Sequence, residues 1–437
     1  MDARTFITKL DEASELQHIT TAVSPRFEVA RLIAQHDGQP VLFENLIGFP
    51  GWRLAAGYIA QRAHFGRAIG CTIGELISRM NNAVAHPVSP PRISEAPCQQ
   101  VVIDDVDLTR IPIPRYHPLD GGPYITSGVA VICDPDYGRN LSFHRLMQIG
   151  KDRLVGRIVE QRGTYTAWEK TDAGLPMAVC IGLPPHVLLA AAMSPKKGVD
   201  EMAVAHAMAP TPTVRAKTLP LDIPAEAELV LEGYLTHEFA TEGPFPDLTG
   251  TMDGTREQPV FHVTTITHRK DPIFHALLPA GLEHKNLMGM PREPTIYAEV
   301  SKVTKCTGVR ITPAGCSWLH AAVQIVPQGP EDARRAIEAA FRGHTSLKHV
   351  VVVDTDVDVH DPSDIEWAIA TRFQADRDLM VLEDQPSSSL DPSAHQIPGQ
   401  KARTTKIGLD ATIPWGAARE GYLRVRYDTP MDQGGAK

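Results

Sequence analysis

The sequence lacks most of the short motifs by which enzymes are commonly recognised. Its six cysteines never form a Cys-x-x-Cys pair, so neither a zinc knuckle nor a redox dithiol is indicated. We expect reduced thiols without a catalytic role. The Gly-rich phosphate loops of the Walker and Rossmann types are absent, and no repeat of fixed period is present. Function must therefore be sought in residues dispersed along the chain.

An excess of basic charge and long apolar runs are also lacking. Lys and Arg number 43 against 52 Asp and Glu, and the net charge of -9 is spread along the chain. Nucleic-acid-binding proteins usually present a basic face, so we expect no nucleic-acid partner. No apolar run approaches the roughly 20 residues of a membrane helix, and the acidic, amphipathic start is unlike a signal peptide. These features favour a cytoplasmic globular protein without membrane association.

What the sequence does contain is a change of pattern along the chain. Residues 1–95 are mixed, with helices expected over "LDEASELQHI" and over "TIGELISRMNNAVAH", which Thr72 would cap. Residues 96–295 are rich in short strand-like runs such as "SGVAVICD" and "PVFHVTTITHR". Residues 296–437 alternate strands and helices in a βαβ rhythm. We predict an α+β protein of three domains with these bounds, the middle one a β-rich barrel with inserted helices.

One stretch, "TEGPFPDLTG", places two carboxylates at either end of a stiff Gly-Pro-Phe-Pro insert. Each proline restricts the residue before it away from helix, so we expect an ordered loop. Glu242 and Asp247 could then be directed at one place. A surface turn with two solvated acids is the alternative, because turns are rich in Gly, Pro and Asp.

Other polar residues stand in comparable stretches elsewhere. Asn140 precedes Arg145 by five residues in "GRNLSFHRLMQIG", Glu201 opens a predicted helix, and Lys406 lies in "TTKIGLDATIPW". Taken singly, each has an ordinary structural explanation. Asn140 fits a turn, Glu201 fits a first helical turn favoured by the helix dipole, and the two basic residues fit a solvated surface.

Taken together, these stretches resemble the UbiD family of decarboxylases, which use prenylated FMN. The resemblance runs from "EAPCQQVVIDDVDLTRIPIP" to "TKIGLDAT", and its most specific parts are the "EGPFPD" loop, the Asn140–Arg145 segment and "DVDVHDPSDIEWAIATRFQADRD". It implies a mixed N-terminal region, a split β-barrel that binds flavin, and an α/β C-terminal domain for oligomerisation. A homodimer or larger homo-oligomer is expected, with a flavin prenyltransferase as supplier of the cofactor.

In that family the loop supplies two acids of a Glu-Arg-acid triad, which implies Glu242, Arg145 and Asp247 as catalytic residues. Removal of CO₂ from an sp² carbon leaves an electron pair that side chains cannot accept, so a cofactor must take it up. An acid must then protonate the same carbon, and two carboxylates near one site push one pKa up. We assign Asp247 as the proton donor by its place in the loop, and Glu242 with Arg145 as the orienting pair.

The resemblance also implies a divalent metal at the cofactor phosphate, held in the family by an Asn, a His and a Glu. Asn140 and Glu201 match the first and the last, but Gln161 stands where the His is expected. A set of oxygen ligands suits Mg²⁺ or Mn²⁺, with K⁺ or Na⁺ as an accompanying cation. The remaining expected cofactor contacts are Ser142, Arg145 and Lys406, the last as a point charge at the phosphate.

The segment "LLPAGLEHKNLMGMP" falls where the family's substrate pocket is lined. Glu283 and His284 are its polar pair, and they are either structurally satisfied or in contact with a polar group of the substrate. The implied activity is reversible non-oxidative decarboxylation of an aromatic, heteroaromatic or α,β-unsaturated carboxylic acid. Two alternatives stay open. One is a split-barrel flavin reductase with ordinary FMN, which needs no triad, and the other is a non-catalytic flavin-binding member, suggested by Gln161.

Overall fold

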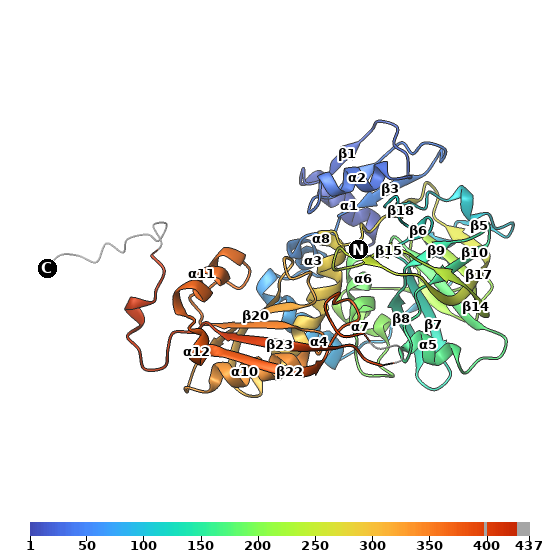
Figure 1. Cartoon of the computed structure of the whole chain (residues 1–437). Helices are drawn as coiled ribbons and strands as arrows, with labels where there is room; N and C mark the ends of the chain where they lie inside the picture. Colours follow the sequence, from blue (N-terminus) through green and yellow to red (C-terminus); the bar gives the residue numbers. More distant parts are fainter. Residues whose placement is uncertain (397–399, 426–437) are drawn as a thin grey trace. The chain divides into compact units, whose positions relative to one another are not determined.

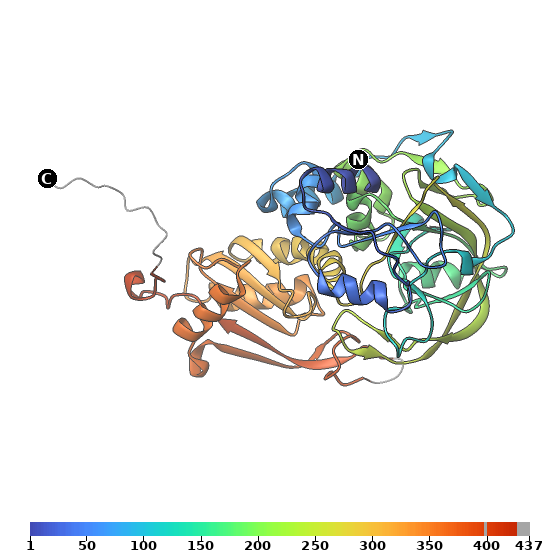
Figure 2. The same ribbon diagram turned by 90° about the horizontal axis from the view of Figure 1, so that it is seen from above.

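The structure, a computed structural model, describes residues 1–396 and 400–425. These residues separate into two compact units (Figure 1 and Figure 2). The first unit comprises residues 1–294, 313–318 and 390–392, and the second comprises residues 295–312, 319–389 and the described residues from 393 onward. No helix among the described residues is both long enough and apolar enough to cross a membrane.

The N-terminal segment is only partly helical where a helix was predicted. Helix α1 (Ala3–Glu12) is capped by Asp2, whose side chain accepts a hydrogen bond from Thr5 N (2.8 Å). The chain then turns at Ser14, where φ is 58°, and the rest of "LDEASELQHI" enters strand β1 (Gln17–Ile19). The single helix predicted over this stretch is therefore wrong beyond Glu12, because a residue with positive φ does not continue an α-helix.

The other N-terminal elements follow the expected order. Thr72 caps a short 3-10 helix (Ile73–Glu75) that leads into the next predicted helix, and Glu75 Oε2 accepts from both Thr72 N and Thr72 Oγ1 (2.8 Å each). A small sheet has the order β1-β2-β3-β18. The elements are α2 (Glu28–Gln35), β2 (Val41–Phe43), β3 (Arg53–Ala56), α3 (Arg62–Ile69), α4 (Leu76–Ala85) and β18 (Ile273–His275).

A nine-stranded sheet forms the centre of the first unit. In spatial order its strands are β6 (Tyr124–Ile125), β9 (Leu146–Gln148), β10 (Arg153–Gly156), β17 (Arg256–His268), β14 (Leu229–Glu242), β11 (Leu175–Ile181), β7 (Val129–Asp134) and β8 (Gly138–Phe143), with β5 (Val101–Ile103) also paired to β17. Among the described residues the path has two ends, β6 and β8, and does not close. The α+β class is confirmed, whereas a split barrel is not.

Two hydrophobic cores lie on the two faces of this sheet. Along β7, Val129 and Val131 pack into one core with helices α6 (Pro185–Ala192) and α7 (Glu201–Met208). The alternate residues Ala130 and Ile132 pack into the other core. On edge strand β8, Asn140 and Ser142 pair with Ile132 and Ala130. Because side chains alternate along a strand, Asn140 and Ser142 share one face of β8.

The remaining elements of the first unit are short. A three-stranded sheet has the order β13-β12-β4, and a two-stranded one pairs β15 with β16. Their bounds and those of the neighbouring helices are β4 (Arg92–Ile93), β12 (Thr213–Arg215), β13 (Asp222–Pro224), β15 (Phe245–Pro246), β16 (Met252–Asp253), α5 (Gly163–Trp168), α8 (Leu282–Gly289) and α9 (Glu293–Ser301), the last of which continues into the second unit.

The second unit contains the predicted βαβ pattern. Its sheet has the order β19 (Lys305–Ile311), β20 (His320–Val326), β21 (His349–Val353), β23 (Arg403–Asp410) and β22 (Leu379–Pro386), with α10 (Asp332–Gly343), α11 (Pro362–Arg372) and α12 (Ala375–Asp378). Strands β20, β21 and β23 are parallel. A Cβ added to Gly408 would lie 2.2 Å from Ile337 of α10, so α10 packs directly on the backbone of β23.

Candidate active site

The "EGPFPD" stretch forms the ordered loop that its prolines predict. Strand β14 ends at Glu242, and the chain turns through β15 and β16 and returns as β17. Across the turn Phe245 pairs with Asp253, and Glu242 pairs with Arg256. Gly121 N donates to Pro244 O (3.0 Å), and a Cβ at Gly121 would lie only 2.3 Å from Gly243 O. This close backbone contact requires glycine at position 121 and holds the loop in place.

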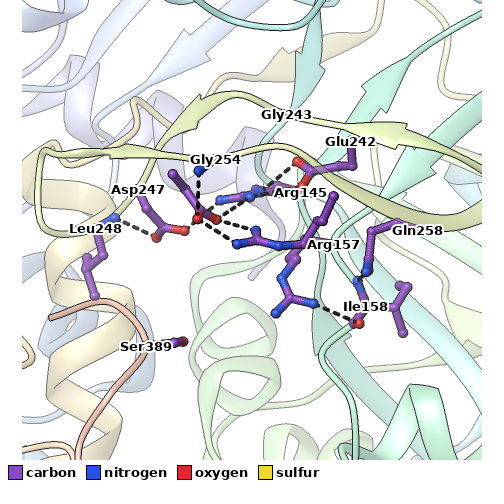
Figure 3. Close-up of polar contacts among 12 residues, drawn as sticks. Arg145, Arg157, Ile158, Glu242, Gly243, Asp247, Leu248, Gly254, Gln258 and Ser389 are labelled. Atoms are coloured by element: carbon purple, nitrogen blue, oxygen red, sulfur yellow. Dashed lines mark hydrogen bonds and ion pairs between the residues drawn. The ribbon is translucent and has the colours of Figure 1, made fainter. Parts of the chain in front are cut away.

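The side chain of Arg145, between β8 and β9, connects the acids of this loop (Figure 3). Arg145 Nε and Nη2 donate to the two oxygens of Glu242 (3.0 Å each), and Nη1 donates to Asp247 Oδ2 (2.6 Å). Burial lowers the pKa of Arg145, but the bond with Glu242 and the nearby acids outweigh it, and the net shift is upward. The structure thus brings together all three residues of the predicted triad.

The two acids of the triad have different surroundings. The Glu242 side chain is 0% exposed and also accepts from the Tyr124 hydroxyl (3.0 Å). The Asp247 side chain is 22% exposed, and its Oδ1 accepts from Leu248 N (2.6 Å). Burial raises the pKa of Tyr124, with Glu242 contributing in the same direction, so Tyr124 stays a neutral donor. The Glu242 carboxylate is therefore buried and held by hydrogen bonds to Arg145 and Tyr124, whereas the Asp247 side chain is partly exposed to solvent.

Three charged residues that the sequence did not indicate complete this cluster. Asp253 Oδ2 accepts from Arg145 Nη2 (2.7 Å) and from Arg256 Nη1 (2.6 Å). Burial raises the pKa of Asp253, but the bonds from Arg256 and Arg145 outweigh it and lower that pKa to about 2. The pKa of Arg157 is lowered by burial and by the charges of Arg256 and Arg145. Asp253 follows Asp247 by six residues. Predicting a hairpin over "DLTGTMD" would have indicated that Asp253 lies near the triad.

Asn140 and Glu201, the predicted metal ligands, are in direct contact. Asn140 Nδ2 donates to Glu201 Oε1 (3.0 Å), and Leu141 N donates to Glu201 Oε2 (2.9 Å). Asn140 Oδ1 is buried and has no hydrogen-bond partner, and burial raises the pKa of Glu201 to about 7. An unsatisfied amide oxygen beside a desolvated carboxylate fits a hard divalent cation. Within the described residues, no group of three or more His, Cys, Asp or Glu could hold a metal.

The third predicted ligand, Gln161, makes no observed contact with Asn140 or Glu201. Its side chain is exposed and its φ is 63°. Two residues later, a Cβ on Gly163 would lie 3.2 Å from Asn140 Oδ1. The space next to the unsatisfied oxygen is thus left open by a glycine. A ligand role for Gln161 stays a prediction.

Ser142, a predicted cofactor contact, belongs to a polar group that includes His144. Ser142 Oγ lies 3.1 Å from both His144 Nε2 and Thr164 Oγ1. Burial lowers the pKa of His144 to about 4, so its ring is neutral at physiological pH. Asn140 and Ser142 on β8 and His144 just beyond its end are spaced two residues apart, and this strand-like spacing could have indicated that they form one set.

Lys406 lies in the second unit, on β23, and its contacts are within that unit. It is 2% exposed, and its Nζ donates to Thr345 O (2.7 Å). Burial lowers the pKa of Lys406 to about 8. Lys406 is therefore a buried base, so the alternative of a solvated surface lysine is wrong. Its contact with a cofactor phosphate stays a prediction.

Glu283 and His284, the predicted substrate contacts on α8, differ in their surroundings. Glu283 is 4% exposed and accepts from Gly57 N (2.8 Å) and Ile59 N (3.1 Å). His284 Nδ1 accepts from Ala280 N (3.1 Å). Burial lowers the pKa of His284, and Asp247 and Arg145 are near enough to act on it in opposite directions. The charges of the triad thus reach His284, while Glu283 binds backbone groups of the N-terminal region.

Comparison with known proteins identifies the family to which the chain belongs. Three models match in succession: the N-terminal domain of 3-octaprenyl-4-hydroxybenzoate carboxy-lyase over residues 7–84, its Rift-related domain over residues 91–282 and its C-terminal domain over residues 285–411. The chain belongs to the UbiD family. Its relatives at about 40% identity are named as decarboxylases, and this protein is an enzyme of the carboxy-lyase class.

Individual UbiD relatives match over nearly the whole chain. The anhydromevalonate phosphate decarboxylase of Methanosarcina mazei is 41% identical over 94% of this chain and 96% of its own. That of Methanothermobacter thermautotrophicus is 40% identical over 97% and 99%. Among solved structures, the UbiD-class enzyme HmfF from Pelotomaculum thermopropionicum in complex with FMN superposes with a TM-score of 0.92 at 34% identity, covering 98% of this chain and 97% of that one. The predicted family is confirmed, and the flavin reductase alternative has no support.

Proposed function

We propose that this UbiD-family enzyme decarboxylates a small, phosphorylated, α,β-unsaturated aliphatic acid without net oxidation. The name of the relatives at about 40% identity, anhydromevalonate phosphate decarboxylase, describes a phosphorylated acid that has lost water and so carries a double bond. The apo 3,4-dihydroxybenzoic acid decarboxylase of Enterobacter cloacae, with an aromatic substrate in its name, is only 26% identical (TM-score 0.91, over 98% of this chain and 96% of that one). The α,β-unsaturated part of the sequence-based expectation is therefore favoured over the aromatic part.

The geometry around Arg145 is the observation that supports the chemistry best. Glu242, with both oxygens on Arg145 and no exposure, suits a permanently ionised orienting group. Asp247 shares the same guanidinium through one oxygen and is partly exposed. Asp247 would carry a proton to the carbon that loses CO₂ and regain it from outside between turnovers. A positioned carboxylic acid commonly accelerates such a step about 10²–10⁴-fold.

The cofactor of the proposed reaction is prenylated FMN, as in the HmfF structure solved with prFMN. When bound, this cofactor supplies the electron sink that side chains lack. Asn140 and Glu201 would hold a Mn²⁺ or Mg²⁺ ion at its phosphate, because a hydrogen bond joins the two side chains and the buried Asn140 Oδ1 has no partner. Ser142 and Lys406 would contact the cofactor, and K⁺ or Na⁺ would accompany the divalent ion. A flavin prenyltransferase would supply the cofactor, and a homodimer or larger homo-oligomer is the expected assembly.

His284 is the group we assign to the substrate. Its Nδ1 is occupied by Ala280 N–H, so the proton of the neutral ring lies on Nε2, where it can be donated. A neutral donor within reach of the charge of Asp247 can bind a substrate oxygen without competing for the catalytic proton. Glu283, whose oxygens already accept from Gly57 and Ile59, is the weaker of the two predicted substrate contacts.

The test compares three acids on one preparation. The enzyme is co-expressed with a flavin prenyltransferase, and CO₂ release is measured with a phosphorylated branched enoic acid, its dephosphorylated form and a benzoic or cinnamic acid. One charge-assisted contact to the phosphate contributes about 1.5–3 kcal/mol. We therefore expect kcat/KM to be about 10- to 150-fold higher with the phosphorylated acid than without the phosphate. A preference for the aromatic acid would contradict the proposal.

A further inference from the structure

We propose that Asp253 and Arg256 are positioning residues that act through Arg145 to set how firmly Asp247 holds its proton. The inference rests on the proposed role of Asp247 as the proton donor. It concerns residues to which neither the sequence nor the family match assigned a role. It predicts that the two residues have opposite effects on the same proton.

The contacts form one continuous network. Arg145 Nη1 binds Asp247 Oδ2 (2.6 Å), and Arg145 Nη2 binds Asp253 Oδ2 (2.7 Å). Arg256 Nη1 and Nη2 bind the two oxygens of Asp253 (2.6 and 2.8 Å), and Gly254 N adds a bond to Oδ1 (3.0 Å). Asp253 and Asp247 are therefore acceptors on the two terminal nitrogens of a single guanidinium.

The loop architecture holds this network in register. Phe245 and Asp253 are paired between β15 and β16, and Glu242 and Arg256 are paired between β14 and β17. Both arms of one hairpin thus contribute charged side chains to Arg145. The Arg145 guanidinium also lies 5.1 Å from the centre of the Phe245 ring, in a cation–π contact. Arg145 cannot move toward one acid without moving away from another.

The charges near Asp247 decide the sign of each effect. Those that face it or reach it through the network are Arg145, Glu242, Asp253 and Arg256, with Arg157 beside them. Asp247 also acts electrostatically on His284 of α8, whose pKa is lowered by burial. A negative charge near a carboxyl favours its protonated form, and a positive charge favours its ionised form. Asp253 should therefore help Asp247 keep its proton, and Arg256 should oppose this.

Loss of either partner also changes the hydrogen bonding in the same direction as the charge. Without the Asp253 carboxylate, Arg145 would bind Asp247 more fully and favour its ionised form. Without the Arg256 guanidinium, the Asp253 carboxylate would draw Arg145 more strongly and leave Asp247 less well bound. A purely structural clamp predicts something else, namely that both substitutions loosen the loop and lower the rate alike.

The experiment measures kcat against pH for Asp253→Asn, Arg256→Gln, the double variant and Arg256→Lys, all loaded with cofactor. A donor must be protonated, so activity falls as pH rises through its titration. We expect Asp253→Asn to move this alkaline limb down by about 0.5–1 pH unit and Arg256→Gln to move it up by a similar amount. The double variant and Arg256→Lys should lie near wild type.

A second measurement does not depend on turnover. Infrared titration of the flavin-free protein follows the protonated-carboxyl band that is lost in Asp247→Asn. We expect this band to persist to higher pH in Arg256→Gln and to vanish at lower pH in Asp253→Asn. Failure of the proposed function would appear as no CO₂ release with any acid while these band shifts remain.

The matched control is Glu257→Gln, which removes an exposed negative charge next to Arg256 in the sequence. The Glu257 carboxylate accepts a hydrogen bond from Thr241 Oγ1 (2.6 Å). The substitution should leave both the pH profile and the infrared band unchanged. The proposal is overturned if Asp253→Asn and Arg256→Gln shift the limb in the same direction, or if neither shifts it. If Asp253→Asn does not fold, the comparison of Arg256→Gln with Arg256→Lys still decides.

Discussion

The Glu242 carboxylate binds the Arg145 guanidinium side-on, with Nε and Nη2 each 3.0 Å from one of its oxygens. Bidentate pairs of this kind fix both the position and the plane of the arginine. Because the Glu242 side chain is 0% exposed and that of Arg145 is 10% exposed, the pair is sequestered from water. Removal of one partner would leave the other charge buried without compensation.

Substitutions in this pair should therefore lower both activity and stability. Arg145→Ala is expected to lower the free energy of unfolding by about 3–5 kcal/mol and to reduce turnover at least about 100-fold. Glu242→Gln should reduce turnover as strongly with a smaller loss of stability, because an amide retains one acceptor. Thermal unfolding and CO₂ release on the same samples check this. Wild-type turnover in either variant would remove the pair from the mechanism.

Metal retention should depend on Glu201. We expect Glu201→Gln to lower the divalent metal content and the amount of bound flavin, because the amide loses the charge that attracts a hard cation. Elemental analysis and flavin absorbance are measured side by side, with Asp200→Asn as the neighbouring control. Asp200 binds Arg139 (2.6 Å) and caps α7, so its loss should affect stability more than metal content. Equal metal content in Glu201→Gln and wild type would place the ion elsewhere.

The open side of the Asn140–Glu201 pair can be tested by adding an imidazole. Gly163→His should raise metal occupancy, because its Cβ would lie 3.2 Å from Asn140 Oδ1 and the ring could reach the same ion. The side chain at position 161 is exposed, so we expect Gln161→His to raise metal occupancy less than Gly163→His does. Metal per protein, measured over a pH series, distinguishes the two, since a histidine ligand releases metal as it is protonated below about pH 6.5. A larger gain at position 161 would restore Gln161 as the third ligand position.

Lys406 offers a test in which stability and binding move in opposite directions. Its pKa is lowered to about 8, so burial of the charged form costs stability below that pH. Lys406→Met should stabilise the flavin-free protein by roughly 1–3 kcal/mol at neutral pH, and this advantage should shrink as pH rises from about 8 toward the unfolded value of about 10.4. The same variant should retain less flavin if Lys406 serves the phosphate. Full flavin occupancy in Lys406→Met would exclude that role.

The loop acids could be predicted from sequence because they lie close together in one stiff stretch. Glu242 and Asp247 are separated by four residues that include both prolines, so local rules were sufficient. Arg145, nearly a hundred residues earlier, entered only through the family resemblance. Asp253 and Arg256 were missed because their roles depend on β15 and β16, a ladder of two residue pairs that is too short to leave an alternating pattern.

The limits at the metal site have a different physical cause. Gln161 is predicted as a ligand from its place sixteen residues after Arg145, and the residues just before it are not regular secondary structure. A φ of 63° at Gln161 redirects the chain, so Gly163 is the residue beside Asn140. Sequence spacing alone does not place a side chain where the backbone turns in a way that residue identity does not announce, so a ligand role for Gln161 stays a prediction. The same applies to α1, where Ser14 ended the helix earlier than its apolar spacing indicated.

The central claim, that Asp247 delivers the proton after loss of CO₂, is tested most directly by single-turnover CO₂ release from Asp247→Asn loaded with cofactor. We predict that the wild type turns over repeatedly in D₂O and places one deuterium at the carbon that lost CO₂. Asp247→Asn should release no more than about one CO₂ per bound flavin and then stop. The control Glu257→Gln should behave as wild type. Continued turnover of Asp247→Asn at the wild-type rate, with deuterium incorporated as before, would contradict the account.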